Sequence, residues 1–426
     1  MPKIPTPLTI LIGKGVREVA KLRGGGSALP GLFVESIDKN FIANCLSQLP
    51  KGVVLISGTN GKTTTTKMVV ELLEGQGLKV FTNRTGSNFT RGVAAALLGE
   101  ITAKGELKAD IAVLELDEAH AVHFVKIVKP RYCLLLNVMR DQLDRFGEID
   151  ATAKLLKTVA ENTTDTVIVN REDPRLVTAV NELDDNKVSY FGLNPELRSE
   201  FPSDDDMRDS ISTTTDHPPA TAILQSVTEN IAKFQLNTDT LELKLKLEGV
   251  YNIFNAAAAM AVVSAILGEK LDTKQLGITL EAVTPAFGRG EKLIVNNQPL
   301  ELVLVKNPSG FRLGLKSFPP EDYATMIAIN DNYADGRDMS WLWDVDFASL
   351  KKESVASVSG VRAYDMALRL QYDEVEVTSV EPNLQKALKQ FIKDYPDKPK
   401  RIYCTYTAML TLRRDLAKIT DVKVIS

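Results

Sequence analysis

The segment with the most definite chemistry is "ISGTNGKTTTTK", which runs from Ile56 to Lys67. Glycines let backbone N–H groups close on phosphate oxygens, and a helix that begins after them adds a favourable dipole. A lysine in such a loop neutralises the β- and γ-phosphates of a nucleotide, and the hydroxyl that follows it binds magnesium. Lys62 and Thr63 stand at these two positions. The sequence therefore predicts a phosphate loop made by Gly58, Thr59, Asn60, Gly61, Lys62, Thr63 and Thr64.

This loop departs from the commonest pattern, GxxxxGK[ST], because Ile56 stands where the first glycine would be. The alternative interpretation is a tight turn that happens to contain a lysine. The context favours the phosphate loop, since the apolar segment "VVLIS" precedes it and the helical segment "TKMVVELLEGQG" follows it.

A second unusual segment is "INDNYADGRDMSWLWDVDF", which contains five aspartates and both tryptophans of the chain. A solvated acidic loop would not need the tryptophans, and a core strand would not tolerate the aspartates. Trp341 and Trp343 are either anchors of a protein interface or ordinary core residues. In the second case, Asp344 would merely cap the next helix.

The histidines give a weaker signal. His120 and His123 lie beside Asp117 and Glu118, which would suit a transition-metal site, packing residues or substrate-side residues. His217 lies in a polar stretch and is expected to be solvated.

Alternating strands and helices must position the phosphate loop. Strand patterns such as "GVVLIS", "ADIAVLELD" and "RYCLLLNV" alternate with helical patterns such as "RGVAAALLGEI". This alternation predicts a mostly parallel, doubly wound α/β sheet. The period-two stretch "KFQLNTDTLELKLKLEGVYN" predicts a small antiparallel sheet, and "NIFNAAAAMAVVSAILG" predicts a long helix.

A second α/β unit begins near residue 300, with the strands "LELVLVKN", "YATMIAIND" and "RIYCTYT" and the helix "NLQKALKQFIKD". We also expect a helix over 348–353 and a strand at "DEVEVTS". The expected domains are therefore 1–298 and 299–426. A polar stretch at about 196–220, which includes "SDDDMRDSISTTTDHPP", predicts an exposed insertion.

Composition limits the possible classes of protein. A chain of 426 residues with 44% hydrophobic and 25% charged residues is typical of a globular protein with at least two cores. The net charge of −4 argues against a nucleic-acid binder, and the apolar runs are too short to span a bilayer. No signal-peptide pattern is present. A reducing cytosol fits the three widely spaced cysteines, Cys45, Cys133 and Cys404.

The loop "GTNGKTTT" after "VVLIS" resembles the phosphate loop of the Mur ligase and folylpolyglutamate synthase superfamily. Five further motifs follow in the family's order: "AVLELDEAH", "LNVMRDQLDRFGE", "GVYNIFNAAAA", "GRGE" and "INDNYADGRD". Gln142 and Tyr251 replace histidines that the family usually has. The resemblance implies a Mur-ligase-type central ATPase domain, followed by a Rossmann-like α/β C-terminal domain.

The resemblance also implies roles for residues that match the family motifs. ATP would be used with Mg²⁺, and Thr63 and Glu115 would hold the metal ion. Lys62 and Arg289 would neutralise and clamp the transferring phosphate. Gly288 and Glu291 complete the motif around Arg289.

Further roles concern the nucleoside. Asn252 or Asn255 would contact the adenine side, and Asp331 would hold the ribose hydroxyls. Many family members use a carbamoylated lysine, and either Lys154 or Lys157 lies near that place in this sequence.

Other segments resemble one branch of the superfamily, the MurT family of ligase subunits of lipid II isoglutaminyl synthase. These are "LVKNPSGF", "NDNYADGRDMSWLWDVDF", "YDMALRL" and "TYTAMLTLRRDL", together with the early "GGGSALPG" and "TGSNFTRG". The resemblance covers nearly the whole chain. Well-known members carry a four-cysteine zinc ribbon where this sequence has the acidic segment 203–219, so we expect no zinc site.

The MurT resemblance implies a step of peptidoglycan synthesis. The D-glutamate α-carboxyl of the lipid II stem peptide would be amidated to D-isoglutamine through an acyl phosphate. A GatD-type glutaminase subunit would supply ammonia, in a heterodimer or a larger complex, because no cysteine of this chain has a convincing histidine partner. Asp344 would reach toward that partner's Cys–His pair, with Asp338 and Asp335 as the next candidates. The protein would be cytoplasmic and meet its substrate at the inner face of the membrane.

Two alternatives remain open. One is a ligase that adds an amino acid, as in folylpolyglutamate synthesis or another Mur step. The other is a scaffold without catalytic activity that binds nucleotide and a partner, although the intact set of Lys62, Thr63 and Glu115 argues against it.

Overall fold

The computed structural model describes residues 7–22, 29–83, 89–141, 149–201, 217–228, 231–247, 250–284 and 289–422. The chain divides into two compact units. The first unit comprises Met1–Val138 and Asp150–Thr284, and the second comprises Met139–Ile149 and Pro285–Ile425.

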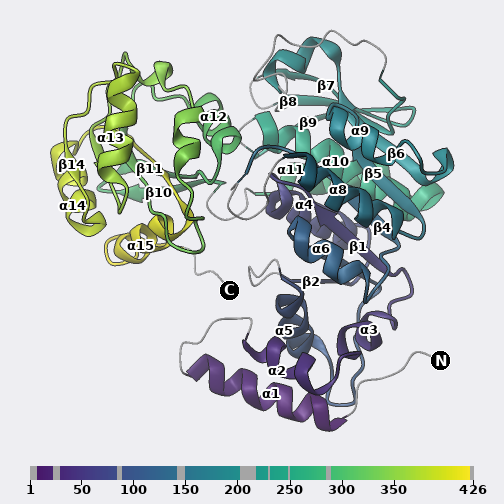
Figure 1. Ribbon diagram of the computed structural model, residues 1–426. Coiled ribbons are helices and arrows are strands. Elements are labelled where there is room, and N and C mark those ends of the chain that lie inside the picture. The colour runs from purple at the N-terminus through teal and green to yellow at the C-terminus, as the bar shows by residue number, and fades with distance from the viewer. Residues whose placement is uncertain are drawn as a thin grey trace. The chain divides into compact units, whose positions relative to one another are not determined.

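The first unit is built on a nine-stranded sheet in the order β2-β3-β1-β4-β5-β6-β7-β8-β9 (Figure 1). Neighbouring strands from β2 to β7 are parallel, whereas β7, β8 and β9 pair antiparallel. The predicted mostly parallel, doubly wound sheet is thus confirmed. The antiparallel strands, which we expected as a small sheet of their own, continue the same sheet. The strands are β1 (Val53–Ser57), β2 (Val80–Thr82), β3 (Ile111–Glu115), β4 (Tyr132–Leu135), β5 (Thr166–Asn170), β6 (Val188–Leu193), β7 (Ala222–Thr228), β8 (Ile231–Leu236) and β9 (Asp239–Lys244).

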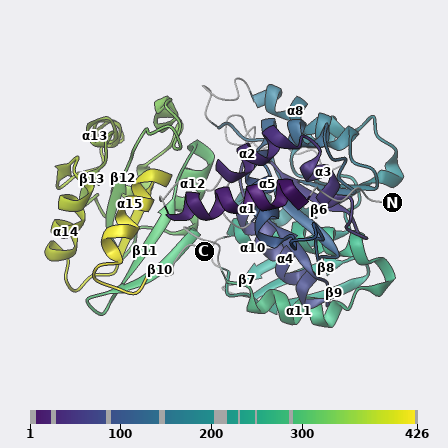
Figure 2. The same cartoon turned by 90° about the horizontal axis from the view of Figure 1, so that it is seen from below.

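Helices pack on this sheet. At one end of the unit, α1 and α2 lie against α5 (Figure 2). The α-helices are α1 (Pro7–Leu22), α2 (Leu29–Ile37), α3 (Phe41–Leu46), α4 (Lys62–Gly75), α5 (Thr90–Glu100), α6 (Glu118–Val125), α8 (Ile149–Glu161), α9 (Pro174–Val180), α10 (Val250–Leu267) and α11 (Thr273–Ala282). Short 3₁₀ turns cover Asp185–Lys187, Pro195–Glu200 and Gly268–Lys270.

The long helix α10 is apolar because it packs on the sheet and on α4. Eight successive residues, 256–263, are fully buried in one core cluster of this unit. By length and composition, Tyr251–Lys270 is the one candidate membrane span among the described residues, but 72% of its apolar window is buried inside the protein. Burial therefore explains its apolar composition.

The second unit is built on a six-stranded sheet in the order β10-β11-β15-β12-β13-β14. Strand β10 is antiparallel to β11, and the other neighbours are parallel. The strands are β10 (Arg289–Val295), β11 (Gln298–Leu304), β12 (Ala324–Ala328), β13 (Ser357–Ser359), β14 (Val380–Glu381) and β15 (Lys400–Cys404). The helices are α12 (Pro308–Ser317), α13 (Ala363–Tyr372), α14 (Leu384–Asp394) and α15 (Tyr406–Leu416), with 3₁₀ turns at Ser340–Asp344 and Ala348–Leu350.

Alternate residues of these strands enter different cores. Ile327 of β12 and Tyr403 of β15 pack with α12 and α13, whereas Met326 and Ile402 pack with α14 and α15. This period of two is the expected geometry of strands with helices on both faces.

Three features differ from the sequence analysis. The division between units falls after Thr284 and not after residue 298, because β10 pairs with β11 in the second sheet. The expected helix at 348–353 is only the 3₁₀ turn Ala348–Leu350. The segment "DEVEVTS" forms an isolated bridge, Val355 with Val377, and the strand β14 follows it.

Candidate active site

The phosphate loop connects the buried strand β1 to α4. Gly58 and Gly61 have φ angles of 132° and 87°, a region that favours glycine. Gly61 also caps α4, so the N–H groups of the first helical turn face the loop. A β-carbon at Gly58 would lie 3.0 Å from the backbone N and O of Asn137. Both glycines are therefore required by the shape of the loop.

Asn137, which follows β4, holds the loop from the neighbouring strand. Its backbone O accepts from the Thr59 N–H at 3.0 Å, and its side-chain Oδ1 accepts from the Asn60 N–H at 2.8 Å. Its Nδ2 donates to the Asn60 O at 3.0 Å. The sequence motif contained Asn137, but its role in holding the loop was not anticipated.

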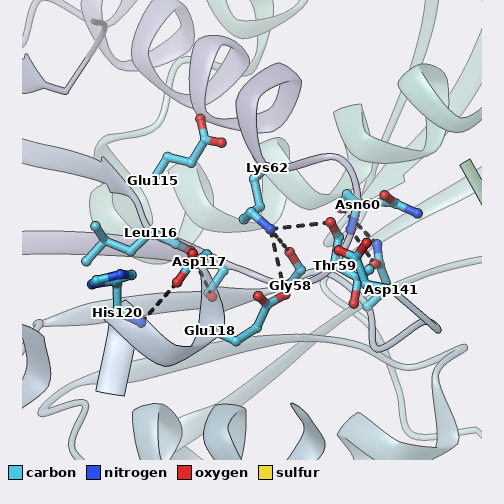
Figure 3. Close-up of polar contacts among 12 residues, drawn as sticks. Gly58, Thr59, Asn60, Lys62, Glu115, Leu116, Asp117, Glu118, His120 and Asp141 are labelled. Atoms are coloured by element: carbon cyan, nitrogen blue, oxygen red, sulfur yellow. Dashed lines mark hydrogen bonds and ion pairs between the residues drawn. The ribbon is translucent and has the colours of Figure 1, made fainter. Parts of the chain in front are cut away.

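Lys62 is buried, and Figure 3 shows its side chain directed toward Gly58, Thr59 and Glu118. Its Nζ donates to the backbone O of Gly58 and, at 3.3 Å, to that of Thr59. The buried carboxylate of Glu118, at the start of α6, lies 3.6 Å from the same Nζ. A cation held at the centre of the loop is suited to neutralising phosphate oxygens.

Thr63 and Glu115 lie together beside Lys62. The Thr63 Oγ1 donates to Glu115 Oε1 at 2.8 Å. Glu115 ends β3, next to Ile56 of β1, and its backbone makes two hydrogen bonds with the Asn83 side chain, at 2.8 and 3.0 Å. A hydroxyl and a carboxylate oxygen fit Mg²⁺, which takes few protein ligands and completes its shell with water and phosphate. The described residues hold no group of three or more His, Cys, Asp or Glu side chains placed for a metal ion.

Helix α10 brings Asn255 to the loop. Asn255 is buried, and a β-carbon added at Gly61 would lie 2.8 Å from its Nδ2. Asn252, one turn earlier on α10, is partly buried. Asn255 is thus a neighbour of the phosphate loop itself. Thr64 is buried, and its hydroxyl has no hydrogen-bond partner among the described residues.

Sequence reasoning missed two residues of this cluster, Asn83 and Glu118. The only signal for Glu118 was its place in "AVLELDEAH", where it drew attention as a possible neighbour of a metal site. His120 packs its ring against Phe89, with centroids 4.5 Å apart. The backbone N–H of His120 donates to Asp117 Oδ1 at 3.0 Å (Figure 3). This contact matches the packing alternative for His120.

In the second unit, the loop after β12 contains the aspartates that the sequence singled out. Asp331 accepts from Arg362, at 2.9 Å from Nε and 2.8 Å from Nη2. Asp335 is buried and accepts from the N–H and Oγ1 of Thr407, at 2.7 and 2.5 Å. Burial raises the pKa of Asp335, against the hydrogen bonds from Thr407, which lower it. Asp335 therefore joins this loop to the start of α15.

The two tryptophans have different environments. Trp341 is 4% exposed and packs edge-on against Phe311 in the core. Trp343 is 49% exposed, and its ring centroid lies 5.0 Å from that of Tyr372 on α13. One tryptophan is therefore core, and the other lies at the surface.

Asp344 follows Trp343 and is partly exposed. Its Oδ2 lies 2.9 Å from Arg140 Nη1, and its backbone O accepts from Arg312. By contrast, Asp338 and Asp346 accept from backbone N–H groups two residues later.

Other expected residues have these positions. Arg289 begins β10 opposite Val303. Lys154 lies exposed on α8, and Lys157 forms an ion pair with Glu182 at 2.7 Å. Gly288, Gln142 and most of the expected insertion, 202–216, lie outside the described residues.

His217 is not solvated, as we had expected. Its side chain is 19% exposed, and its Nε2 lies 2.8 Å from Arg198 Nη1 and 3.7 Å from Glu172. The prediction was wrong because Glu172 and Arg198, which are distant in sequence, make a polar pocket for it.

Solved structures share this fold. MurF from Thermotoga maritima in complex with ADP matches with a TM-score of 0.64 at 16% identity, over 89% of this chain and 84% of that one. Folylpolyglutamate synthase from Mycobacterium tuberculosis, complexed with ADP and AMPPCP, matches with a TM-score of 0.60 at 16% identity, over 87% and 91%. The fold is that of the Mur ligases.

Sequence comparison identifies one family among the proteins with this fold. The family model for the Mur ligase middle domain matches residues 56–263, and that for the MurT ligase C-terminal region matches 304–409. The lipid II isoglutaminyl synthase (glutamine-hydrolyzing) subunit MurT of Streptococcus pneumoniae is 30% identical over 97% of both chains. Its counterpart in Staphylococcus aureus is 30% identical over 89% of this chain and 90% of its own. The chain belongs to the MurT family.

Gly61→Ala is expected to lower the melting temperature and the affinity for ATP more than Gly77→Ala does. Both positions have positive φ, 87° and 85°, so alanine costs each of them about 1–2 kcal/mol. Only the Gly61 substitution would press against Asn255, since nothing lies within 4 Å of a β-carbon at Gly77. Thermal unfolding and ATP titration compare the two variants. Equal losses in both would contradict the close packing of the loop on α10.

Proposed function

We propose that this chain uses ATP to amidate the α-carboxylate of D-glutamate in the lipid II stem peptide, which gives D-isoglutamine. A carboxylate oxygen attacks the γ-phosphorus and ADP leaves. Ammonia then attacks the acyl carbon, inorganic phosphate leaves with that oxygen, and the nitrogen loses a proton. The observation that carries the proposal is the group of Lys62, Thr63 and Glu115 at a phosphate loop, in a member of the MurT family.

Lys62 neutralises charge on the transferring phosphoryl group. Its Nζ exchanges the carbonyl oxygens of Gly58 and Thr59 for phosphate oxygens, while Glu118 stays close enough to orient it. Thr63 and Glu115 would hold Mg²⁺, which supplies further charge neutralisation when bound. Because these groups are already in place, little reorganisation is needed as the phosphoryl group transfers.

Two residues of the second unit carry the remaining roles that we propose. Arg289 would clamp phosphate, and Asp331 would hold the ribose hydroxyls. Arg362 would then share Asp331 with the ribose, since the two side chains already form an ion pair. Asn252 remains the candidate for the adenine side, while the position of Asn255 favours support of the loop.

The ammonia comes from another protein. All three cysteines are buried, and burial raises the pKa of Cys45 and of Cys133 to about 12, and raises that of Cys404 as well. None of them offers the thiolate that glutamine hydrolysis requires. The relatives are named as one subunit of a glutamine-hydrolyzing synthase, which supports a partner subunit that hydrolyses glutamine. We propose that this partner is a GatD-type glutaminase.

Asp344 is the aspartate that we assign to the partner's catalytic site. Its side chain is 41% exposed, whereas Asp335 is buried against Thr407. Asp338 is the second candidate. We further propose that the chain acts in the cytoplasm and meets its lipid-linked substrate at the inner face of the membrane.

The first test supplies the purified chain with ATP, Mg²⁺, lipid II and an ammonium salt, without any glutaminase. Mass spectrometry is expected to detect amidated lipid II. Thr63→Val should lower the rate by about a hundredfold, because it removes a metal ligand without changing the side-chain shape. Thr63→Ser, which keeps the hydroxyl, should stay close to the wild type. A second reaction contains amino acids in place of the ammonium salt, and a product with an added amino acid would support the alternative ligase reaction. Equal rates for the two variants would contradict the metal-binding role.

The second test asks whether Asp344 acts in glutamine hydrolysis or in the ligase reaction itself. In the complex with the glutaminase, Asp344→Ala should lose glutamine-dependent amidation while ammonium-dependent amidation persists. Asp346→Ala is the matched control, because Asp346 is an exposed carboxylate two residues away. Loss of both activities in Asp344→Ala would place Asp344 in the ligase site. Selective loss in Asp338→Ala instead would transfer the role to Asp338.

A further inference from the structure

The first two helices of the chain carry a cluster of exposed apolar side chains. Leu11 and Ile12 of α1 are 72% and 37% exposed, and Leu32, Phe33 and Ile37 of α2 are 41%, 48% and 47% exposed. We call these five residues the α1–α2 surface. Among the described residues of the first unit, the other exposed large apolar side chains lie on separate elements: Ile127, Ile231 and Ile278. Single exposed apolar residues are common on proteins, whereas a cluster of them marks a binding surface.

The opposite faces of these helices are packed against the rest of the unit. Both helices contact α5, which lies between them and β2 (Figure 1). A β-carbon at Gly31 of α2 would clash with the backbone O of Arg91 on α5. One at Gly13 of α1 would lie 2.6 Å from the side chains of Leu98 and Val34. The backbones of the three helices thus approach closely, and the α1–α2 surface is held on a rigid support.

Helix α5 also connects this surface to the phosphate loop. Phe89, the residue before α5, packs on the ring of His120, with centroids 4.5 Å apart. His120 belongs to α6, whose first residue is Glu118. The carboxylate of Glu118 lies 3.6 Å from Lys62 Nζ. Contacts from helix to helix therefore join the α1–α2 surface to the candidate active site within the first unit.

The sequence around this surface is basic, although the chain as a whole is acidic. The first 40 residues contain six Lys and Arg and three Asp and Glu, a net charge of +3, whereas the whole chain has a net charge of −4. Lys39, which follows α2, is exposed, as is Glu18 on α1. Lys14 is partly buried and donates to the backbone O of Ile101 at 2.7 Å. An anionic bilayer attracts a basic segment of this kind.

We propose that the α1–α2 surface binds an anionic phospholipid bilayer, the membrane in which the lipid-linked substrate resides. The inference rests on the proposed function. None of the five residues is Trp, Tyr or Arg, the types that dominate the energy of protein interfaces, and leucine is under-represented there. Leucine, isoleucine and phenylalanine beside lysines are instead typical of helices that lie in the plane of a bilayer surface. The apolar side chains enter the acyl region, and the cations stay near the lipid phosphates.

The test compares two triple variants of the full chain. The first replaces three residues of the α1–α2 surface by serine: Leu11→Ser, Leu32→Ser and Phe33→Ser. The matched control replaces the three separate residues of the same unit, which are 42%, 45% and 53% exposed: Ile127→Ser, Ile231→Ser and Ile278→Ser. The single variant Leu11→Ser, at the most exposed position, repeats the test with the least risk to folding.

Binding is measured by co-sedimentation with vesicles of phosphatidylglycerol and phosphatidylethanolamine, for the chain alone and for its complex with the glutaminase. The first triple variant should bind at least about tenfold more weakly than the wild type, and Leu11→Ser about threefold more weakly. The control should bind like the wild type. Vesicles of phosphatidylcholine should bind the wild type more weakly, because they lack the negative charge.

Amidation with ammonium is measured on lipid II in the same vesicles and on a water-soluble analogue with a short prenyl chain. The first triple variant should lose rate on the vesicles and keep it on the analogue, which also shows that it is folded. Wild-type affinity for vesicles in Leu11→Ser and the triple variant, or no vesicle binding by the wild type, would overturn the proposal.

Two further outcomes separate this surface from other roles. A triple variant that loses only self-association, or only affinity for the glutaminase, would overturn the membrane proposal and make the α1–α2 surface a protein interface. A wild-type chain that binds vesicles through this surface but amidates neither substrate would support the membrane surface and contradict the proposed function.

Discussion

The candidate site depends on the parallel register of three neighbouring strands, β3, β1 and β4. Pairing of Ile56 with Glu115 brings the end of β3 level with the phosphate loop. Pairing of Ser57 with Leu135 does the same for the segment that contains Asn137. A shift of one residue would turn every side chain of a strand to the opposite face, so the buried residues of these strands fix the site as well as the core. The loop glycines then allow Asn137 and Asn255 to approach closely.

The second unit divides the aspartates of one segment among different environments. Asp331 is held by Arg362 at the loop after β12, and Asp335 is buried against α15. Asp344 lies at the surface beside Trp343. The division follows from packing. Trp341 enters the core beside Phe311. Arg369 donates to the backbone O of Leu342, and Trp343, the residue after Leu342, turns toward the surface. One short segment therefore places its aspartates in three separate environments.

Much of the first unit could be predicted because its signals are local. Strand, loop and helix follow each other directly around Lys62, and Glu115 ends a strand with a distinctive motif. Asn83 and Glu118 could not be predicted, since their partners are distant in sequence and only the sheet brings them together. His217 was misjudged for the same reason.

The main element of the second unit that the sequence did not predict is helix α13. Its inner face contains Met366 and Leu370, and its outer face contains Tyr364, Leu368 and Tyr372. Apolar residues on both faces weaken the amphipathic pattern by which helices are recognised. Without this helix, the sequence could not show which tryptophan is buried. The exposed apolar residues of the outer face thus obscured this part of the fold.

The central claim is that the chain itself activates a carboxylate as an acyl phosphate. The most direct measurement uses lipid II with heavy oxygen in the D-glutamate α-carboxylate, together with the purified chain, ATP, Mg²⁺ and ammonium. The account predicts that heavy oxygen appears in inorganic phosphate in proportion to the amide formed. Amide formation with heavy oxygen in AMP, or with none in phosphate, would contradict it.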